Sequence, residues 1–239
     1  KQTSDVIIAF KRFCQLRFKD NFEDYKKVCL LLHTDPIDPN GTDLPKVVEH
    51  LAPECNIKFS ANKITAQDLN ILYNIADITV NISSAEGWGL GITESIMAGT
   101  PVTSVVCGGL QDQMRFTDIY GNWIKFNRDF PTNSNGKYKN CSEWADPIFC
   151  IKNLVGSIPT PYIYESRVSV EDVAKSFDSW YLTKLTDTPG IMDELGLNGR
   201  NWLLSDEANM NAVNMGNKFV NHINNIIERY KNYFKDNFK

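Results

Sequence analysis

Two carboxylates, Glu86 and Glu94, enclose three glycines in the stretch EGWGLGITE. Gly87, Gly89 and Gly91 let the backbone turn sharply and come close to a ligand, because they carry no side chain. A short apolar helix pattern follows at once, and the start of a helix presents unpaired N–H groups and a partial positive charge. This combination predicts a site for an anion, and it suits a diphosphate.

Each glutamate has a plain and a functional interpretation. Glu94 falls near the first turn of the helix, where a carboxylate interacts with the helix dipole by about 0.3–1 kcal/mol. It is also placed to accept hydrogen bonds from two vicinal hydroxyls, as on a ribose. Glu86 is either an exposed loop acid or a polar contact for a second sugar. Taken alone, each glutamate favours the plain interpretation, whereas the glycines and the strand–turn–helix context favour the functional one.

The glycine spacing and the histidines limit the kinds of site that the sequence could form. The glycine spacing is neither G-x-G-x-x-G nor a G-K-[ST] loop, which excludes the dinucleotide fingerprint and the P-loop. The pair Gly108–Gly109 follows the next predicted strand and fits a ligand contact and a plain tight turn about equally. The three histidines, at 33, 50 and 222, do not cluster, so we assign no general base and expect no metal site.

The elements around these residues alternate between strand and helix. Apolar runs predict strands at 27–32, 56–59, 77–82, 101–106 and 123–126. Helical patterns lie at 5–16, 44–51, 66–76 and 89–98, and later at 169–183 and 206–238, with a helix stop at Gly199. This alternation predicts an α/β fold with a mostly parallel sheet and helices on both faces, and ligands bind such sheets at the carboxyl ends of the strands.

We expect a single domain over residues 1–239. The polar, turn-rich segment at about 127–168 reads as an insertion with little regular structure, and the long C-terminal helical region carries an apolar stripe at the spacing of one helix face. The chain begins with Lys and leads directly into a helix, so we expect it to be part of a longer protein.

Composition excludes several classes. The net charge of −4 and the pI near 5.5 argue against a nucleic-acid-binding surface over the whole domain. The longest apolar runs fall well short of the roughly 20 residues that span a bilayer. Six scattered cysteines form no C-x-x-C pair, and with no signal peptide in view we expect a cytoplasmic, reduced protein.

The stretch EGWGLGITESIMAGTPV resembles the E-G-[FW]-G-L-x-x-x-E block of retaining GT-B glycosyltransferases of the family-4-like type. DVIIAF, ITAQDLNILYNIADITVNISS, CGGL and LGLNGRNWL are similar, in order, to flanking segments of that family. The resemblance covers roughly residues 1–126 and 169–239. It implies a Rossmann-like domain that forms the C-terminal, donor-binding half of a GT-B fold, with the N-terminal acceptor domain absent from this chain.

The resemblance also implies roles for particular residues, which fall within one donor site. Glu94 takes the ribose-binding position and Glu86, the catalytic candidate, contacts the transferred sugar. The other donor-binding candidates are Gly87, Trp88, Gly89 and Leu90 along the diphosphate and sugar, Thr93 beside the ribose, Ile64 where the base packs, and Lys1. Lys1 is the available counterpart of a basic pair that neutralises the diphosphate in that family, and Gly91 stands where the family often has proline.

The implied activity is transfer of a sugar from a UDP or GDP sugar to an unknown acceptor, with retention of configuration and without a metal or other cofactor. We expect the chain alone to bind nucleotide but to transfer little sugar, since its partner domain is missing. We expect no nucleic-acid partner, and membrane contact only through a lipid-linked acceptor. The alternatives are a catalytically inactive nucleotide-sugar-binding module, a sugar-nucleotide epimerase or a phosphorylase of the same fold, or an unrelated α/β interaction domain.

Overall fold

A computed structural model describes residues 2–39, 41–156, 162–186 and 188–237. The chain divides into two compact units, residues 1–199 and 200–239. The first unit contains every described strand, and it holds the candidate site. Lys1 lies outside the described residues, so its predicted role stays a prediction.

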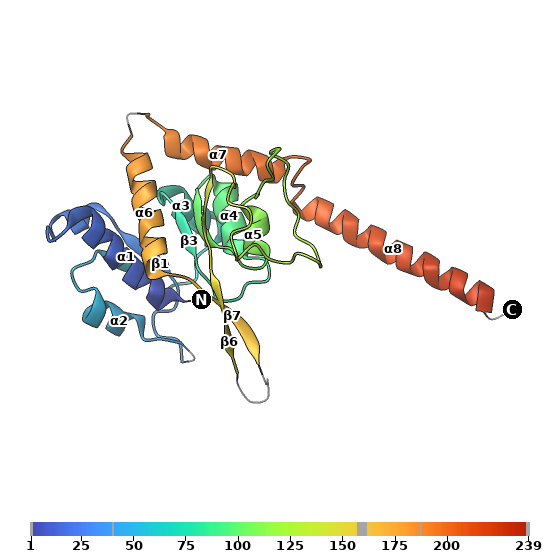
Figure 1. The fold of residues 1–239 in the computed structure, drawn as a ribbon, viewed down its shortest axis with the longest axis horizontal. Coiled ribbons are helices and arrows are strands. Elements are labelled where there is room, and N and C mark those ends of the chain that lie inside the picture. The colour runs from blue at the N-terminus through green and yellow to red at the C-terminus, as the bar shows by residue number, and fades with distance from the viewer. Residues whose placement is uncertain (1, 40, 157–161, 187, 238–239) are drawn as a thin grey trace. The chain divides into compact units, whose positions relative to one another are not determined.

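The strands of the first unit are mainly parallel. β1 (Leu30–His33) pairs with β2 (Ile57–Ser60). β3 (Thr79–Asn81), β4 (Val102–Val105) and β5 (Ala145–Ile148) form a second parallel group with β4 in the middle. The first four strands fall on the predicted apolar runs. Parallel strands flanked by helices confirm the α/β fold class (Figure 1).

Most helices also begin and end close to the predicted positions. Thr65 and Ser169 cap α3 and α6 by accepting hydrogen bonds from the N–H groups three residues on, as their sequence patterns predict. The described helices are α1 (Thr3–Phe18), the 3-10 turn η1 (Asp24–Lys27), α2 (Leu44–Leu51), α3 (Ala66–Ile75), α4 (Leu90–Ala98), α5 (Gly109–Gln113), α6 (Val170–Lys184), α7 (Ile191–Leu204) and α8 (Ala212–Asn237).

The segment 127–168 differs from the prediction of an irregular insertion. It contains β5, which pairs with β4, and an antiparallel hairpin of β6 (Ile151–Val155) and β7 (Ile163–Arg167) that projects from the first unit (Figure 1). The predicted strand at 123–126 is wrong, because only an isolated bridge joins Thr117 to Trp123. The sequence of β5, ADPI, does not predict a strand, because a proline cannot donate a hydrogen bond within a sheet. Pro147 is tolerated because β5 is an edge strand of its group.

The core of the first unit places α1 beside α6 (Figure 1). Phe13 of α1 stacks edge-on against Phe177 and Tyr181 of α6, at 6.2 and 5.8 Å between ring centroids. Arg17 forms a bidentate pair with Asp178, with both N–O distances 2.6 Å. These contacts hold the second half of α1 against α6.

The second unit consists of the end of α7 and of α8. The apolar side chains of α8 predicted to form one stripe are 40–67% exposed; they are Phe219, Val220, Ile223, Ile226, Ile227 and Tyr230. None of the described helices is both long enough and apolar enough to cross a membrane.

Candidate functional site

The glycine-rich loop lies where the fold class places a ligand. It runs from Ile82 to Gly89, directly after β3, and leads into α4. Asn81 fixes its first turn, since its side-chain oxygen accepts hydrogen bonds from the backbone N–H and the hydroxyl of Ser83, at 3.0 and 2.7 Å. Gly89 adopts φ 86°, a left-handed conformation that favours glycine, and is the N-cap residue of α4.

The pair Gly108–Gly109 supports this loop by close backbone packing. Gly109 N–H donates to the carbonyl of Gly87 at 3.0 Å. A Cβ atom on Gly108 would lie 1.9 Å from the carbonyl oxygen of Glu86, and one on Gly109 would lie 2.7 Å from that of Gly87. The approach of two loops therefore accounts for both glycines, which the sequence left open between a ligand contact and a tight turn.

A buried hydrogen-bond network holds the other side of the loop. The indole N–H of Trp88 donates to Thr93 Oγ1 at 2.9 Å, and that hydroxyl donates to Gln113 Oε1 at 2.8 Å. Gln113 Nε2 then donates to the carbonyl of Trp88 at 2.6 Å. Gln113 is fully buried. Trp88 and Thr93, both predicted to lie along the donor, thus use their polar atoms to brace the loop and the start of α4.

Glu94 is exposed on the first turns of α4 and is held by a neighbouring helix. Tyr73 of α3 donates its hydroxyl hydrogen to Glu94 Oε2 at 3.0 Å. Partial burial raises the pKa of Tyr73, and the hydrogen bond to Glu94 raises it further, so the phenol stays protonated as a donor. The carboxylate is thereby oriented while remaining open to solvent, which suits an acceptor for ligand hydroxyls.

The remaining predicted residues occupy the same edge of the strands or the loops beside it. Glu86 is partly exposed in the loop, and Leu90 at the start of α4 is 68% exposed. Ile64 is half-buried in the loop after β2, next to the cap of α3. The structure joins Trp88 and Thr93 in one hydrogen-bonded network through Gln113. Glu86 lies in the same loop, and Glu94 follows Thr93 on α4. Ile64 takes part in none of these hydrogen bonds.

Two supporting residues escaped the sequence analysis. Gln113 and Tyr73 carry no motif, and they reach the loop only because α5 and α3 pack beside α4. A weak signal exists for each: Gln113 follows the glycine pair within one turn, and Tyr73 lies four residues before the strand-leading Asp77.

Asp112 lies beside Gln113 on α5, and burial raises the pKa of its carboxyl from 3.8 to about 6. The folded state therefore holds this proton more tightly than the unfolded state, and stability is lost as the pH rises from about 4 through about 6. We expect Asp112→Asn to be more stable than the parent chain at neutral pH by about 1–2 kcal/mol, allowing for partial exposure of the side chain.

Urea denaturation at about pH 4 and about pH 7.5 checks this expectation. The advantage of Asp112→Asn should shrink at the lower pH, where the parent aspartate is largely protonated in the folded state and partly protonated in the unfolded state. An equal advantage at both pH values would contradict the assigned titration, and Asp129→Asn serves as a control on an exposed acid of the same type.

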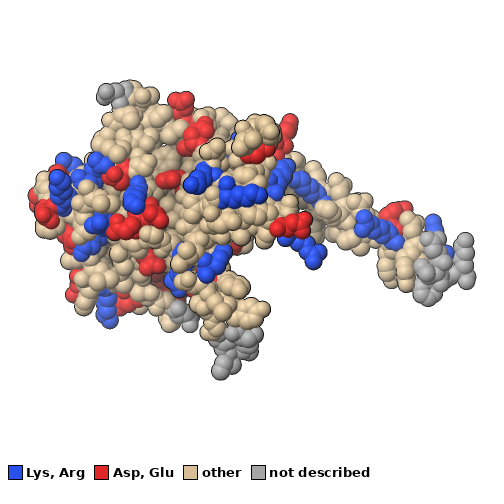
Figure 2. Space-filling model, in the orientation of Figure 1, with Lys and Arg blue, Asp and Glu red and all other residues tan. Residues whose placement is uncertain are grey.

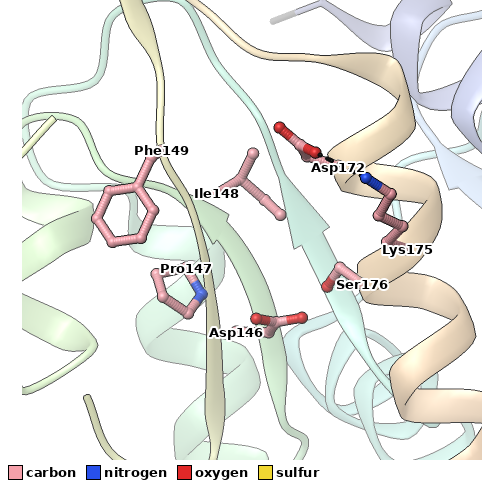
Figure 3. Close-up of a pocket in the computed structure, with 7 residues that line it drawn as sticks. All are labelled: Asp146, Pro147, Ile148, Phe149, Asp172, Lys175 and Ser176. Atoms are coloured by element: carbon pink, nitrogen blue, oxygen red, sulfur yellow. Dashed lines mark ion pairs between the residues drawn. The ribbon is translucent and has the colours of Figure 1, made fainter. Parts of the chain in front are cut away.

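Two cavities lie apart from the glycine-rich loop. One of about 240 Å³ lies between β5 and α6, where the Asp146 carboxylate faces Ser176 and Asp172 pairs with Lys175 at 3.6 Å (Figure 3). Burial raises the pKa of Asp146, while the hydrogen bond from Ser176 opposes the change. The other, of about 370 Å³, is lined by the ends of α3 and α4 and by residues of α7. The lining of neither includes residues 86–94.

No group of three or more His, Cys, Asp or Glu residues within the described ranges is arranged to hold a metal ion. The candidate site comprises a backbone turn at a helix start, two carboxylates, and the polar residues that brace the loop and Glu94.

Comparison with known proteins gives one family match. Residues 41–129 match the family model described as glycosyl transferases group 1. A search of curated proteins found no significant match. The matched region is less than half of the chain, but it contains β2 to β4, the glycine-rich loop, both glutamates and the glycine pair. The match supports a glycosyltransferase of GT-B type with a Rossmann-like domain, a glycosyl transfer function, and a nucleotide sugar as the donor.

Proposed function

We propose that this chain is the donor-binding part of a retaining, family-4-like glycosyltransferase that takes a UDP or GDP sugar and needs no metal. The observation that carries the proposal is the oriented, solvent-open carboxylate of Glu94 on the first turns of a helix whose start is a braced glycine turn. A carboxylate on the first turns of a helix suits the hydroxyls of a ribose, and the N–H groups at the helix start suit the oxygens of a diphosphate.

In this proposal each residue has a defined task. Glu94 accepts hydrogen bonds from the ribose hydroxyls, and Tyr73 keeps it oriented. The backbone N–H groups at the start of α4, next to Leu90, meet the diphosphate and stabilise the charge that develops on it as the sugar leaves. Glu86 contacts hydroxyls of the transferred sugar, and Ile64 packs against the base.

The acceptor is unknown, and we propose that a second domain of the same enzyme supplies its site, so that this chain alone transfers little sugar. An inactive nucleotide-sugar-binding module is the main alternative. A sugar-nucleotide epimerase is the other, and it would convert the donor without an acceptor.

Calorimetric titration of this chain with UDP, GDP, ADP and their common sugar conjugates tests the proposal. We expect saturable binding of one base class and a loss of roughly tenfold or more in affinity for Glu94→Ala, because one charged hydrogen-bond acceptor is worth about 1.5–3 kcal/mol. Glu49→Ala, at an exposed helical glutamate of α2, is the matched control and should bind as the parent does.

The possible results of the titration distinguish the proposed function from its alternatives. Binding that is unaffected by Glu94→Ala would place the nucleotide elsewhere and refute the assigned site. No binding of any nucleotide by the parent chain would refute donor binding by this part alone. Chromatography of the bound sugar conjugate after incubation identifies an epimerase, which would return a different sugar nucleotide.

A further inference from the structure

The candidate donor site combines two carboxylates with a ligand that would itself be an anion. Glu86 and Glu94 lie on the loop and on α4, and a diphosphate would add further negative charge between them. Like charges repel at short range, so a cation from another part of the chain is needed to offset the repulsion between the diphosphate and the two carboxylates. Hairpin β6–β7, which the function proposed so far leaves unused, carries such a cation at its base.

The cation is Lys152 of β6, and hydrogen bonds connect it to the glycine-rich loop. Lys152 Nζ donates to Ser166 Oγ of β7 at 2.6 Å. The backbone N–H of Ser166 donates to the carbonyl of Ser84 at 2.8 Å. Ser84 lies two residues before Glu86. The ammonium group is therefore fixed beside the loop by a two-step path through Ser166.

Gln2, at the start of α1, fastens the base of the hairpin to the end of β3. Its Nε2 donates to the carbonyl of Ser166 at 3.1 Å and to that of Ile82 at 2.7 Å. Its other polar atom, Oε1, is buried and has no hydrogen-bond partner within the described ranges. A ligand hydroxyl could donate the missing hydrogen bond to Oε1. Folds with a parallel sheet bind ligands at the carboxyl ends of their strands, and Gln2 is bonded to the residue that follows β3.

Lys152 is also placed to use its charge on a ligand. Its side chain is exposed, and no ion pair in the described part of the chain joins it to a carboxylate. The neighbouring charges of the hairpin, Arg167 and Glu165, pair with each other at 2.9 Å. They belong to the opposite face, because Lys152 is the register partner of Ser166 and side chains alternate along a strand. Figure 2 shows Lys and Arg side chains where the hairpin joins the first unit.

We propose that Lys152 is a diphosphate-binding residue of the donor site, delivered to the glycine-rich loop by hairpin β6–β7. Its ammonium group neutralises the diphosphate of the bound donor and the charge that grows on it as the sugar leaves. This inference rests on the proposed function, which it extends by assigning a residue that lies outside the region matched by the family model.

Titration of inorganic pyrophosphate and of the tightest-binding nucleoside diphosphate into Lys152→Gln, Lys152→Arg and the parent chain tests the inference. We expect Lys152→Gln to lose roughly tenfold in affinity for both ligands, since a charge-assisted hydrogen bond is removed. Lys152→Arg keeps the charge and should stay within a few fold of the parent. Lys26→Gln is the matched control, because Lys26 is an exposed lysine of η1, before the amino end of β1.

Affinity for the free nucleoside, which lacks phosphate, should not change in Lys152→Gln. Equal pyrophosphate and diphosphate affinity in Lys152→Gln and the parent would overturn the role of Lys152 while leaving the donor site intact. Failure of the parent to bind either ligand would overturn both proposals. Pyrophosphate binding that depends on Lys152, together with nucleotide binding that ignores Glu94→Ala, would retain the anion site and overturn the donor assignment.

Discussion

Gly108→Ala is expected to destabilise the first unit by about 3–5 kcal/mol, which is a large fraction of the stability of an ordinary domain. Two effects add. Gly108 adopts φ 52° and ψ −141°, a conformation that side-chain-bearing residues avoid at a cost of about 1–3 kcal/mol. The new Cβ atom would also lie 1.9 Å from the carbonyl oxygen of Glu86, so that the two loops must separate.

Urea denaturation followed by circular dichroism measures this effect. Gly87→Ala is the matched control from the same pair of loops, because a Cβ atom at Gly87 meets nothing within 4 Å. If Gly108→Ala unfolded at the same urea concentration as Gly87→Ala, the close packing of the two loops would be wrong.

Gln113→Leu is expected to cost about 2–4 kcal/mol and to weaken nucleotide binding as well. The leucine keeps the volume of the side chain but removes the hydrogen bonds to Thr93 Oγ1 and to the carbonyl of Trp88. Because the site of Gln113 is fully buried, no water replaces these partners without a structural change. The loop that precedes α4 would then lose its brace.

A double-mutant cycle with Thr93→Val tests whether the network acts as a unit. Thr93→Val should be less destabilising in the Gln113→Leu background than in the parent chain, since its partner is already gone. Gln67→Leu, at an exposed position of α3, controls for the general effect of the substitution. Strict additivity of the two changes would refute the coupling.

Much of the fold could be predicted because short apolar runs and turn signals are local features. The patterns around β1 to β4, the caps at Thr65 and Ser169 and the glycine turn before α4 depend on residues close in sequence. The match of residues 41–129 to the family model and the resemblance of residues 86–102 rest on the same local block.

The wrong predictions of secondary structure concern residues whose conformation depends on contacts between segments that are distant in the sequence. Gly199 reads as a helix stop, yet α7 continues to Leu204, and a Cβ atom at Gly199 would lie 2.7 Å from Trp144 Cγ. The glycine permits close packing and does not end the helix. Likewise β5 carries Asp146 and Pro147, which disfavour a strand locally, and its pairing with β4 supplies the stabilisation.

The site shows the same division. The glutamates and glycines proposed to face a ligand stand out in the sequence, because their spacing along the chain reflects the geometry of one turn. Tyr73 and Gln113 could not be identified in this way, since Tyr73 lies 21 residues along the chain from Glu94 and Gln113 lies 20 residues from Thr93. Lys152 could not, since it is connected to the loop only through Ser166 of the hairpin.

The braced loop has a consequence for the speed with which a donor is captured. The backbone between Glu86 and Gly89 is held by Gly109 on one side and by Gln113 on the other before any ligand arrives. The entropy cost of ordering this segment therefore falls on folding and does not reduce the free energy of binding. Binding of the proposed nucleotide donor should therefore need no slow rearrangement of this loop.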